Sequence, residues 1–216
     1  LRDKSKDVWE ECYRSPFVQG LGDGALDRDS FKFYLIQDYI YLIRYARVFA
    51  AGALRSPNER IMSHFTAAQH SIICGEMELH RSYMREFGIT EEEAGAARQS
   101  LMNNAYTSNM MSVALTGGAA ETIAVALPCA WSYRDYAVRL ARDFEDKMEG
   151  NFYRSWVRSY SSDEYRASFE WMFGDLDELC EGKTGRGLAE LEEIFRTSVE
   201  FEYLFWDMSY KRQMSY

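Results

Sequence analysis

A proline followed at once by a cysteine, Pro128 and Cys129, stands out in a chain that has only three prolines. Proline lacks a backbone N–H and crowds the carbonyl four residues before it, so a helix running through position 128 must kink or restart. If the helix restarts there, the Cys129 thiol meets free N–H groups and the positive end of the helix dipole, which favour the thiolate. A thiolate at that place predicts nucleophilic catalysis. The alternative is a kinked core helix that holds a small buried thiol.

An acidic residue, Asp38, lies in the aromatic stretch QDYIYL. On a helix it shares a face with Tyr41 and Tyr45, and the neighbouring positions Ile36 and Ile40 are apolar. A carboxylate in such packed surroundings needs a partner, and a ligand amine or a tyrosine hydroxyl would serve. The alternative is a solvated edge with aromatic packing beside it.

A second acidic residue, Glu202, lies one helical turn before Phe205 and Trp206. Removal from water raises the pKa of a carboxyl, and a carboxyl that stays protonated at neutral pH suits a general acid. The alternative is that Glu200 and Glu202 form the polar side of an amphipathic helix. Periodicity does not choose between these two interpretations.

Two tyrosines lie at the ends of expected helices, Tyr106 at an entry and Tyr160 near an end. The chain has fifteen tyrosines, and most tyrosines in proteins serve packing. Residue type alone therefore favours packing for both.

A metal site is not predicted. The stretch GEMELH supplies Glu76, Glu78 and His80, but the Glu–His step of three residues that di-iron bundles use is missing. His64 and His70 are also wrongly spaced for an obvious site. We expect all three histidines to be structural or surface residues, and we predict no cofactor.

These candidate residues lie on a succession of expected helices, and strand signals are nearly absent. Gly88, Gly117 and Gly118 are expected to end helices, and Thr90 with Glu93 has the spacing of a capping box. The pattern predicts an all-α fold, a single multi-helix bundle of one domain over 1–216. The main expected helices cover 30–54, 57–87, 107–116, 119–148, 163–180 and 188–210.

Composition excludes several classes of function. The formal net charge is −9 and no cluster of Lys or Arg occurs, so a nucleic-acid partner is not expected. The longest apolar stretch, 113–131, contains Glu121, two glycines and Pro128, which argues against a membrane span. No secretory signal is apparent, and the four cysteines are far apart, so we expect free thiols in the cytoplasm.

Six ordered segments of the chain together resemble the TenA family, also called thiaminase II, which has a haem-oxygenase-like helical fold. They are FKFYLIQDYIYLIRYARV, GEMELHRSYM, NNAYTSNM, LPCAWSYRDYAVRL, SWVRSYSSDEY and FEYLFWDMSY. The resemblance covers almost the whole chain. It implies a homotetrameric hydrolase that converts the small molecule 4-amino-5-aminomethyl-2-methylpyrimidine to the hydroxymethyl compound and ammonia, with thiamin cleavage as a related activity.

The same resemblance implies a role for each candidate residue. Cys129 would be the nucleophile and Glu202 the acid that pairs with it, while Asp38 would hold the amino and ring-nitrogen edge of the pyrimidine. Tyr160 would support the cysteine or the substrate by hydrogen bonding. The aromatic walls would be Tyr41, Tyr106 and Phe205. Ala130, directly after the cysteine, departs from the larger residue expected there, which leaves the exact substrate open.

Two other functions fit the same fold. The first is a pyrimidine-binding or regulatory protein that keeps the pocket without turnover. The second is a haem or quinone-biosynthesis oxidase, which needs a histidine-rich pocket or a proximal ligand.

Overall fold

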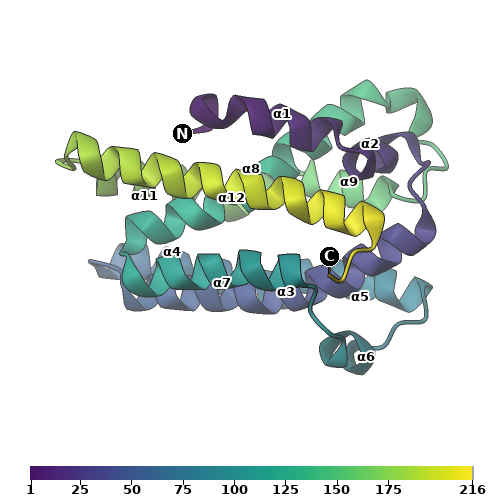
Figure 1. Cartoon of the computed structure of the whole chain (residues 1–216), viewed down its shortest axis with the longest axis horizontal. Helices are drawn as coiled ribbons and strands as arrows, with labels where there is room; N and C mark the ends of the chain where they lie inside the picture. The colour runs from purple at the N-terminus through teal and green to yellow at the C-terminus, as the bar shows by residue number, and fades with distance from the viewer. Residues whose placement is uncertain (216) are drawn as a thin grey trace.

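The structure, a computed structural model, describes residues 1–215, and within them the secondary structure is helical without strands (Figure 1). The predicted all-α bundle is confirmed. The elements are η1 (Arg2–Ser5), α1 (Lys6–Arg14), α2 (Pro16–Asp23), α3 (Arg28–Leu54), α4 (Glu59–Ser71), η2 (Ile72–Glu76), α5 (Met77–Glu86), α6 (Glu91–Ala96), α7 (Leu101–Thr116), α8 (Ala119–Asp143), η3 (Glu145–Lys147), α9 (Arg154–Tyr160), α10 (Asp163–Phe169), α11 (Trp171–Cys180) and α12 (Gly185–Lys211).

Three long helices, α3, α8 and α12, form the centre of the bundle, and α7 packs against all three. The Asp27 side chain caps α3 by accepting a hydrogen bond from the N–H of Ser30 at 3.1 Å. Thr184 caps α12 in the same way through the N–H of Gly187. Because α12 crosses the length of the molecule (Figure 1), it can bring a carboxylate from the end of the chain to residues of α3, α7 and α8.

The expected helix over 57–87 is interrupted. It begins at Glu59, where the Asn58 side chain accepts a hydrogen bond from the N–H of Ile61, so Pro57 precedes the helix. Between α4 and α5 the chain makes a π-helical turn, η2, which ends at Glu76. Such turns insert a residue into a helix and often occur at functional sites. Gly88, with φ of 65°, adopts the left-handed conformation just beyond the end of α5.

The sequence left open whether the helix kinks or restarts at Pro128, and the restart does not occur, because α8 runs through the proline from Ala119 to Asp143. Proline costs a helix interior about 3 kcal/mol. Packing outweighs this cost here, since Ile123 to Leu127 are at most 1% exposed and α8 contacts α7, α9, α11 and α12. Cys129 therefore lies in the middle of a helix and not in a first turn.

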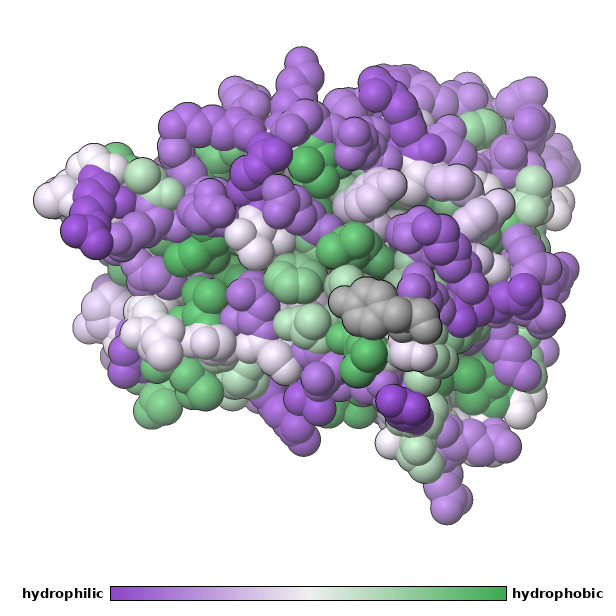
Figure 2. Space-filling view, in the orientation of Figure 1, coloured by the Kyte–Doolittle hydropathy of each residue, from purple (hydrophilic) through white to green (hydrophobic). Residues whose placement is uncertain are grey.

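The surface is largely polar on the face seen in Figure 2, with apolar side chains gathered over the groove between α7 and α12. Leu101 and Leu204 contribute to this groove and are 46% and 37% exposed. No helix among residues 1–215 has the length and hydropathy to cross a membrane.

Candidate active site

The carboxyl of Glu202 is buried in the centre of the bundle, with 2% of the residue exposed. The Tyr106 hydroxyl donates a hydrogen bond to its Oε1 at 2.6 Å, whereas its Oε2 accepts no well-aligned bond from residues 1–215. Burial raises the pKa of Glu202 to about 8, against the opposing effect of the Tyr106 hydrogen bond. Glu202 is therefore mainly a neutral acid at pH 7. Its neighbour Glu200 is exposed and pairs with Arg196, so the polar-side interpretation holds for Glu200 and is wrong for Glu202.

The Cys129 thiol lies beside this carboxyl, and the residue is 7% exposed. Burial, followed by the charges of Glu202 and Glu76, raises the pKa of the thiol well above its usual value, and the nearby Tyr41 hydroxyl opposes the rise only in part. The expected support of a thiolate by a helix N-terminus is therefore wrong. The resting group is a thiol, and reaction at sulfur requires a base to take its proton.

The three predicted aromatic walls lie together. The Tyr41 ring centroid is 5.3 Å from that of Tyr106 and 5.6 Å from that of Phe205. Tyr41 also stacks on Tyr45, whose hydroxyl donates to the carbonyl of Ala126 at 2.8 Å. An aromatic layer from α3, α7 and α12 thus surrounds the carboxyl and the thiol.

Asp38 is 2% exposed, so the solvated-edge interpretation is wrong. Its Oδ2 is hydrogen-bonded to Nε2 of His80, which is 1% exposed. Burial alone would lower the pKa of His80, but the Asp38 carboxylate outweighs it and raises that pKa. His80, expected to be structural or at the surface, is a buried partner of a predicted site residue. The role of Asp38 toward a pyrimidine stays a prediction.

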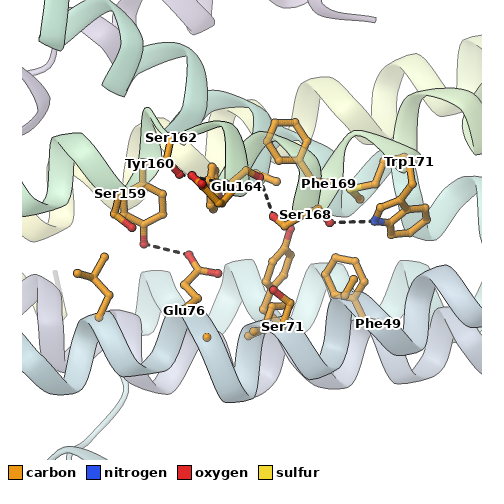
Figure 3. Close-up of a pocket in the computed structure, with 18 residues that line it drawn as sticks. Phe49, Ser71, Glu76, Ser159, Tyr160, Ser162, Glu164, Ser168, Phe169 and Trp171 are labelled. Carbon is orange, nitrogen blue, oxygen red and sulfur yellow. Dashed lines mark hydrogen bonds between the residues drawn. The ribbon is translucent and has the colours of Figure 1, made fainter.

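A cavity of about 240 Å³ adjoins this layer (Figure 3). Tyr45 and Ala130 line it, and Tyr45 lies close to the Cys129 thiol, which is not itself part of the lining. Of the seven predicted site residues, Tyr160 lines the cavity. Its hydroxyl donates to Oε1 of Glu76 at 2.9 Å and makes no hydrogen bond to Cys129 among the described residues, so its role toward a substrate stays a prediction.

Glu76 was considered in the sequence only as a possible metal ligand, and its place in the cavity was missed. Burial raises the pKa of its carboxyl to about 7, while the positive charge of His80 lowers it and the Asp38 carboxylate raises it. The i, i+4 spacing of Glu76 and His80 was the available signal, because it puts both side chains on one helical face. Across residues 1–215 no group of three His, Cys, Asp or Glu side chains is placed to hold a metal ion.

Residues 2–212 match the sequence pattern of the family described as TENA/THI-4/PQQC. The chain belongs to this family. A protein of Halalkalibacterium halodurans named aminopyrimidine aminohydrolase is 41% identical over 99% of this chain and 95% of its own. One of Helicobacter pylori with the same name is 40% identical over 98% of this chain and 97% of its own. These relatives confirm the predicted family and the predicted enzyme class, a hydrolase.

Solved structures agree with this assignment. A protein named TenA family transcription regulator, from Silicibacter sp. TM1040, superposes with a TM-score of 0.89 at 27% identity, covering 97% of this chain and 94% of its own. A domain with a heme oxygenase-like fold from Shewanella denitrificans superposes with a TM-score of 0.74 at 16% identity, covering 98% and 91%. The second likeness concerns the fold alone and confirms the haem-oxygenase-like bundle.

Proposed function

We propose that this chain hydrolyses 4-amino-5-aminomethyl-2-methylpyrimidine to the hydroxymethylpyrimidine and ammonia, with Cys129 as nucleophile and Glu202 as acid. The observation that carries the proposal is the contact of a buried thiol with a buried carboxyl whose Oε2 lacks a well-aligned partner among residues 1–215. The names of the two relatives at about 40% identity support the substrate class.

In the first step Glu202 and Cys129 act together. An aminopyrimidine resists addition until a ring nitrogen is protonated, and a carboxyl with a pKa of about 8 holds a proton to give at neutral pH. As the sulfur adds to a ring carbon, the Glu202 carboxylate formed by that transfer accepts the proton of the thiol. This route replaces a preformed thiolate, which the burial of Cys129 disfavours.

In the second step the ring expels the substituent on its 5-methylene group. An exocyclic double bond forms, the amine leaves, and water adds to the methylene carbon. Departure of the thiol then restores the aromatic ring. Tyr41, Tyr106 and Phe205 would stack on the flat ring, and Asp38 would accept a hydrogen bond from its amino group. With a thiazolium in place of the amine, the same steps give thiamin cleavage.

We further infer that the chain acts as one domain in a homotetramer and in the reducing cytoplasm. One apolar cluster runs through the bundle, exposed apolar residues remain between α7 and α12, and the four cysteines are free. Light scattering of the purified protein tests the tetramer, for which a mass of four chains is expected and the mass of one chain would refute it.

The direct experiment incubates the purified protein with the aminomethylpyrimidine and measures ammonia and hydroxymethylpyrimidine. Formation of both in equal amounts, abolished in Cys129→Ser, is the expected result. Tight binding of the pyrimidine without product would instead support a binding or regulatory protein, the function named for the Silicibacter structure. Activity of the variant equal to that of the parent would refute the role of the thiol.

A further inference from the structure

A second carboxyl, that of the half-buried Glu76, lines the cavity, and the proposed steps do not use it. Glu76 ends the π-helical turn η2, and one of its oxygens accepts the hydrogen bond of Tyr160. Figure 3 shows the carboxyl of Glu76 directed from η2 across the cavity, with its other oxygen facing the open space. Glu202 lies on the opposite helix, α12, and is not part of the cavity lining. The charges of two carboxyls therefore act on the thiol, one in the enclosed aromatic layer and one at the cavity.

The charge of Glu76 acts on the Cys129 thiol. It is the second largest charge effect on the Cys129 thiol, after that of Glu202. A pyrimidine attached to sulfur and protonated by Glu202 would carry its 5-substituent away from the enclosed layer, because the cavity is the adjoining space. The leaving amine would then lie next to Glu76. Resting on the proposed function, we propose that Glu76 is a second catalytic acid, which protonates the departing amine and then accepts a proton from the attacking water.

The step balances in atoms and electrons. The bond between the 5-methylene carbon and the amine nitrogen breaks, and its electron pair stays on nitrogen. The proton of the Glu76 carboxyl passes to that nitrogen, so ammonia leaves and a carboxylate remains. Electrons of the thiol adduct form the exocyclic double bond. Water then adds to the methylene carbon and gives one proton to Glu76, which restores the carboxyl.

The surroundings of Glu76 allow its carboxyl both to donate a proton to the amine and to accept one from water. Its pKa of about 7 allows it to give and to take a proton near neutral pH. This value is set first by burial, and then by the charge of His80 of α5, the charge of Asp38 of α3 and the hydrogen bond of Tyr160 of α9. The other titratable groups around Glu76 are Tyr45 of α3 and Glu164 and Tyr165 of α10, which line the same cavity, and Cys129 of α8, on whose thiol the charge of Glu76 acts.

The proposal predicts selectivity for the leaving group. An amine leaves as ammonia only if it gains a proton, whereas the thiazolium of thiamin leaves as a neutral thiazole and needs none. Loss of the Glu76 acid should therefore slow expulsion of the amine and spare expulsion of the thiazole. A role of Glu76 in packing alone would affect both substrates alike.

The test compares the parent with Glu76→Gln and Glu76→Asp under single-turnover conditions, with enzyme in excess. Glu164→Gln is the matched control, because Glu164 lines the same cavity but is exposed and is assigned no chemistry. We expect Glu76→Gln to slow ammonia release about 100-fold and thiazole release less than about 3-fold. Glu76→Asp, which keeps a carboxyl, should recover part of the ammonia release, and Glu164→Gln should match the parent.

The pH profile gives a second readout, which does not depend on thiamin being cleaved. Ammonia release by the parent should fall as the pH rises through about 7, and in Glu76→Gln this fall should move toward about 8, where Glu202 ionises. Equal slowing of both leaving groups, or an unchanged pH profile, would overturn the proposal. Failure of the proposed function is distinguishable, because the parent itself would then release no more ammonia than Cys129→Ser does.

Discussion

Two buried thiols in this molecule, Cys12 and Cys129, differ in what surrounds them. Cys12 in α1 is fully buried and its thiol donates to the backbone carbonyl of Val199 at 3.7 Å. Cys129 in α8 lies beside the Glu202 carboxyl and the Tyr41 hydroxyl, next to a cavity. Burial is the largest cause of a raised pKa for both thiols.

A shifted pKa therefore does not distinguish a reactive cysteine from an inert one in this fold. The difference is whether a group that can take the proton is in contact with the sulfur and whether a substrate can reach it. Cys12 contacts a carbonyl, which cannot take a proton, whereas Cys129 contacts a carboxyl that can. The predictions below test this contrast.

The largest effect is expected at the thiols themselves. Cys129→Ser should lower kcat/KM for the aminomethylpyrimidine by about 1,000-fold or more, because a hydroxyl is a far weaker nucleophile. Cys12→Ser keeps a donor to the Val199 carbonyl and should change kcat/KM by less than about 3-fold. Equal losses of kcat/KM in the two variants, with unchanged thermal stability, would show that the two thiols do not differ in their role.

Glu202→Gln should lower kcat by about 100-fold to 1,000-fold, because the amide retains the Tyr106 hydrogen bond but has no acidic proton. Only the protonated carboxyl is active as the acid, so beyond the fall near pH 7 that is assigned to Glu76, the parent should lose further activity as the pH rises through about 8. The variant should lack this second decrease. Glu200→Gln on the same helix is the control and should behave as the parent does. A parent rate that increases steadily above pH 8 would contradict the assignment.

Asp38→Asn should act mainly on binding. A hydrogen bond to a charged group contributes about 1.5–3 kcal/mol, so KM should rise by roughly 10-fold to 100-fold with a smaller change in kcat. His80→Gln, which alters the partner of Asp38 but leaves the carboxylate in place, should raise KM less. An effect of Asp38→Asn on kcat alone would place this carboxylate in the chemistry instead.

The smallest effect concerns stability. The pKa values of Glu76 and Glu202 are raised to about 7 and about 8 in the folded chain, from 4.5 for an unperturbed carboxyl. As the pH rises, the unfolded state therefore releases these protons at a lower pH than the folded state does. The contribution of the two neutral carboxyls to the free energy of unfolding is fully present below pH 4.5 and is lost as the pH rises to about 8. Between pH 5 and pH 9 the Tm should fall by on the order of 10 °C, and by less in Glu202→Gln. A Tm that rises over this range would contradict the presence of two neutral carboxyls in the folded chain.

The fold was predictable from the sequence because its signals are local. Three helices begin at caps made by contacts within three residues, those of Asp27, of Ser162 and of the capping box of Thr90 with Glu93. The path through Pro128 was not predictable, because it depends on packing of α8 against helices distant in the chain. Helix propensities give the free-energy cost of a proline inside a helix. They do not give the stabilisation that packing against neighbouring helices supplies.

The candidate site was predictable in part. Resemblance to a family identified Cys129, Glu202 and the aromatic walls, and the structure brings them together. The pair of Asp38 with His80 joins residues 42 positions apart, and the pair of Tyr160 with Glu76 joins residues 84 apart. The helical periodicity of a sequence does not indicate which residues distant in the chain form such pairs. Ala130, the noted departure, lines the cavity, so its small side chain leaves room there.

A crystal structure with bound hydroxymethylpyrimidine tests most directly where the chemistry occurs. We expect the ring to lie between Cys129 and Glu202, with the sulfur about 3–3.5 Å from a ring carbon and Oε2 of Glu202 bonded to a ring nitrogen. The hydroxymethyl group should then point toward Glu76. A ring bound instead at the far end of the cavity, against Phe49 and Trp171, with Cys129 and Glu202 still in contact, would contradict the account.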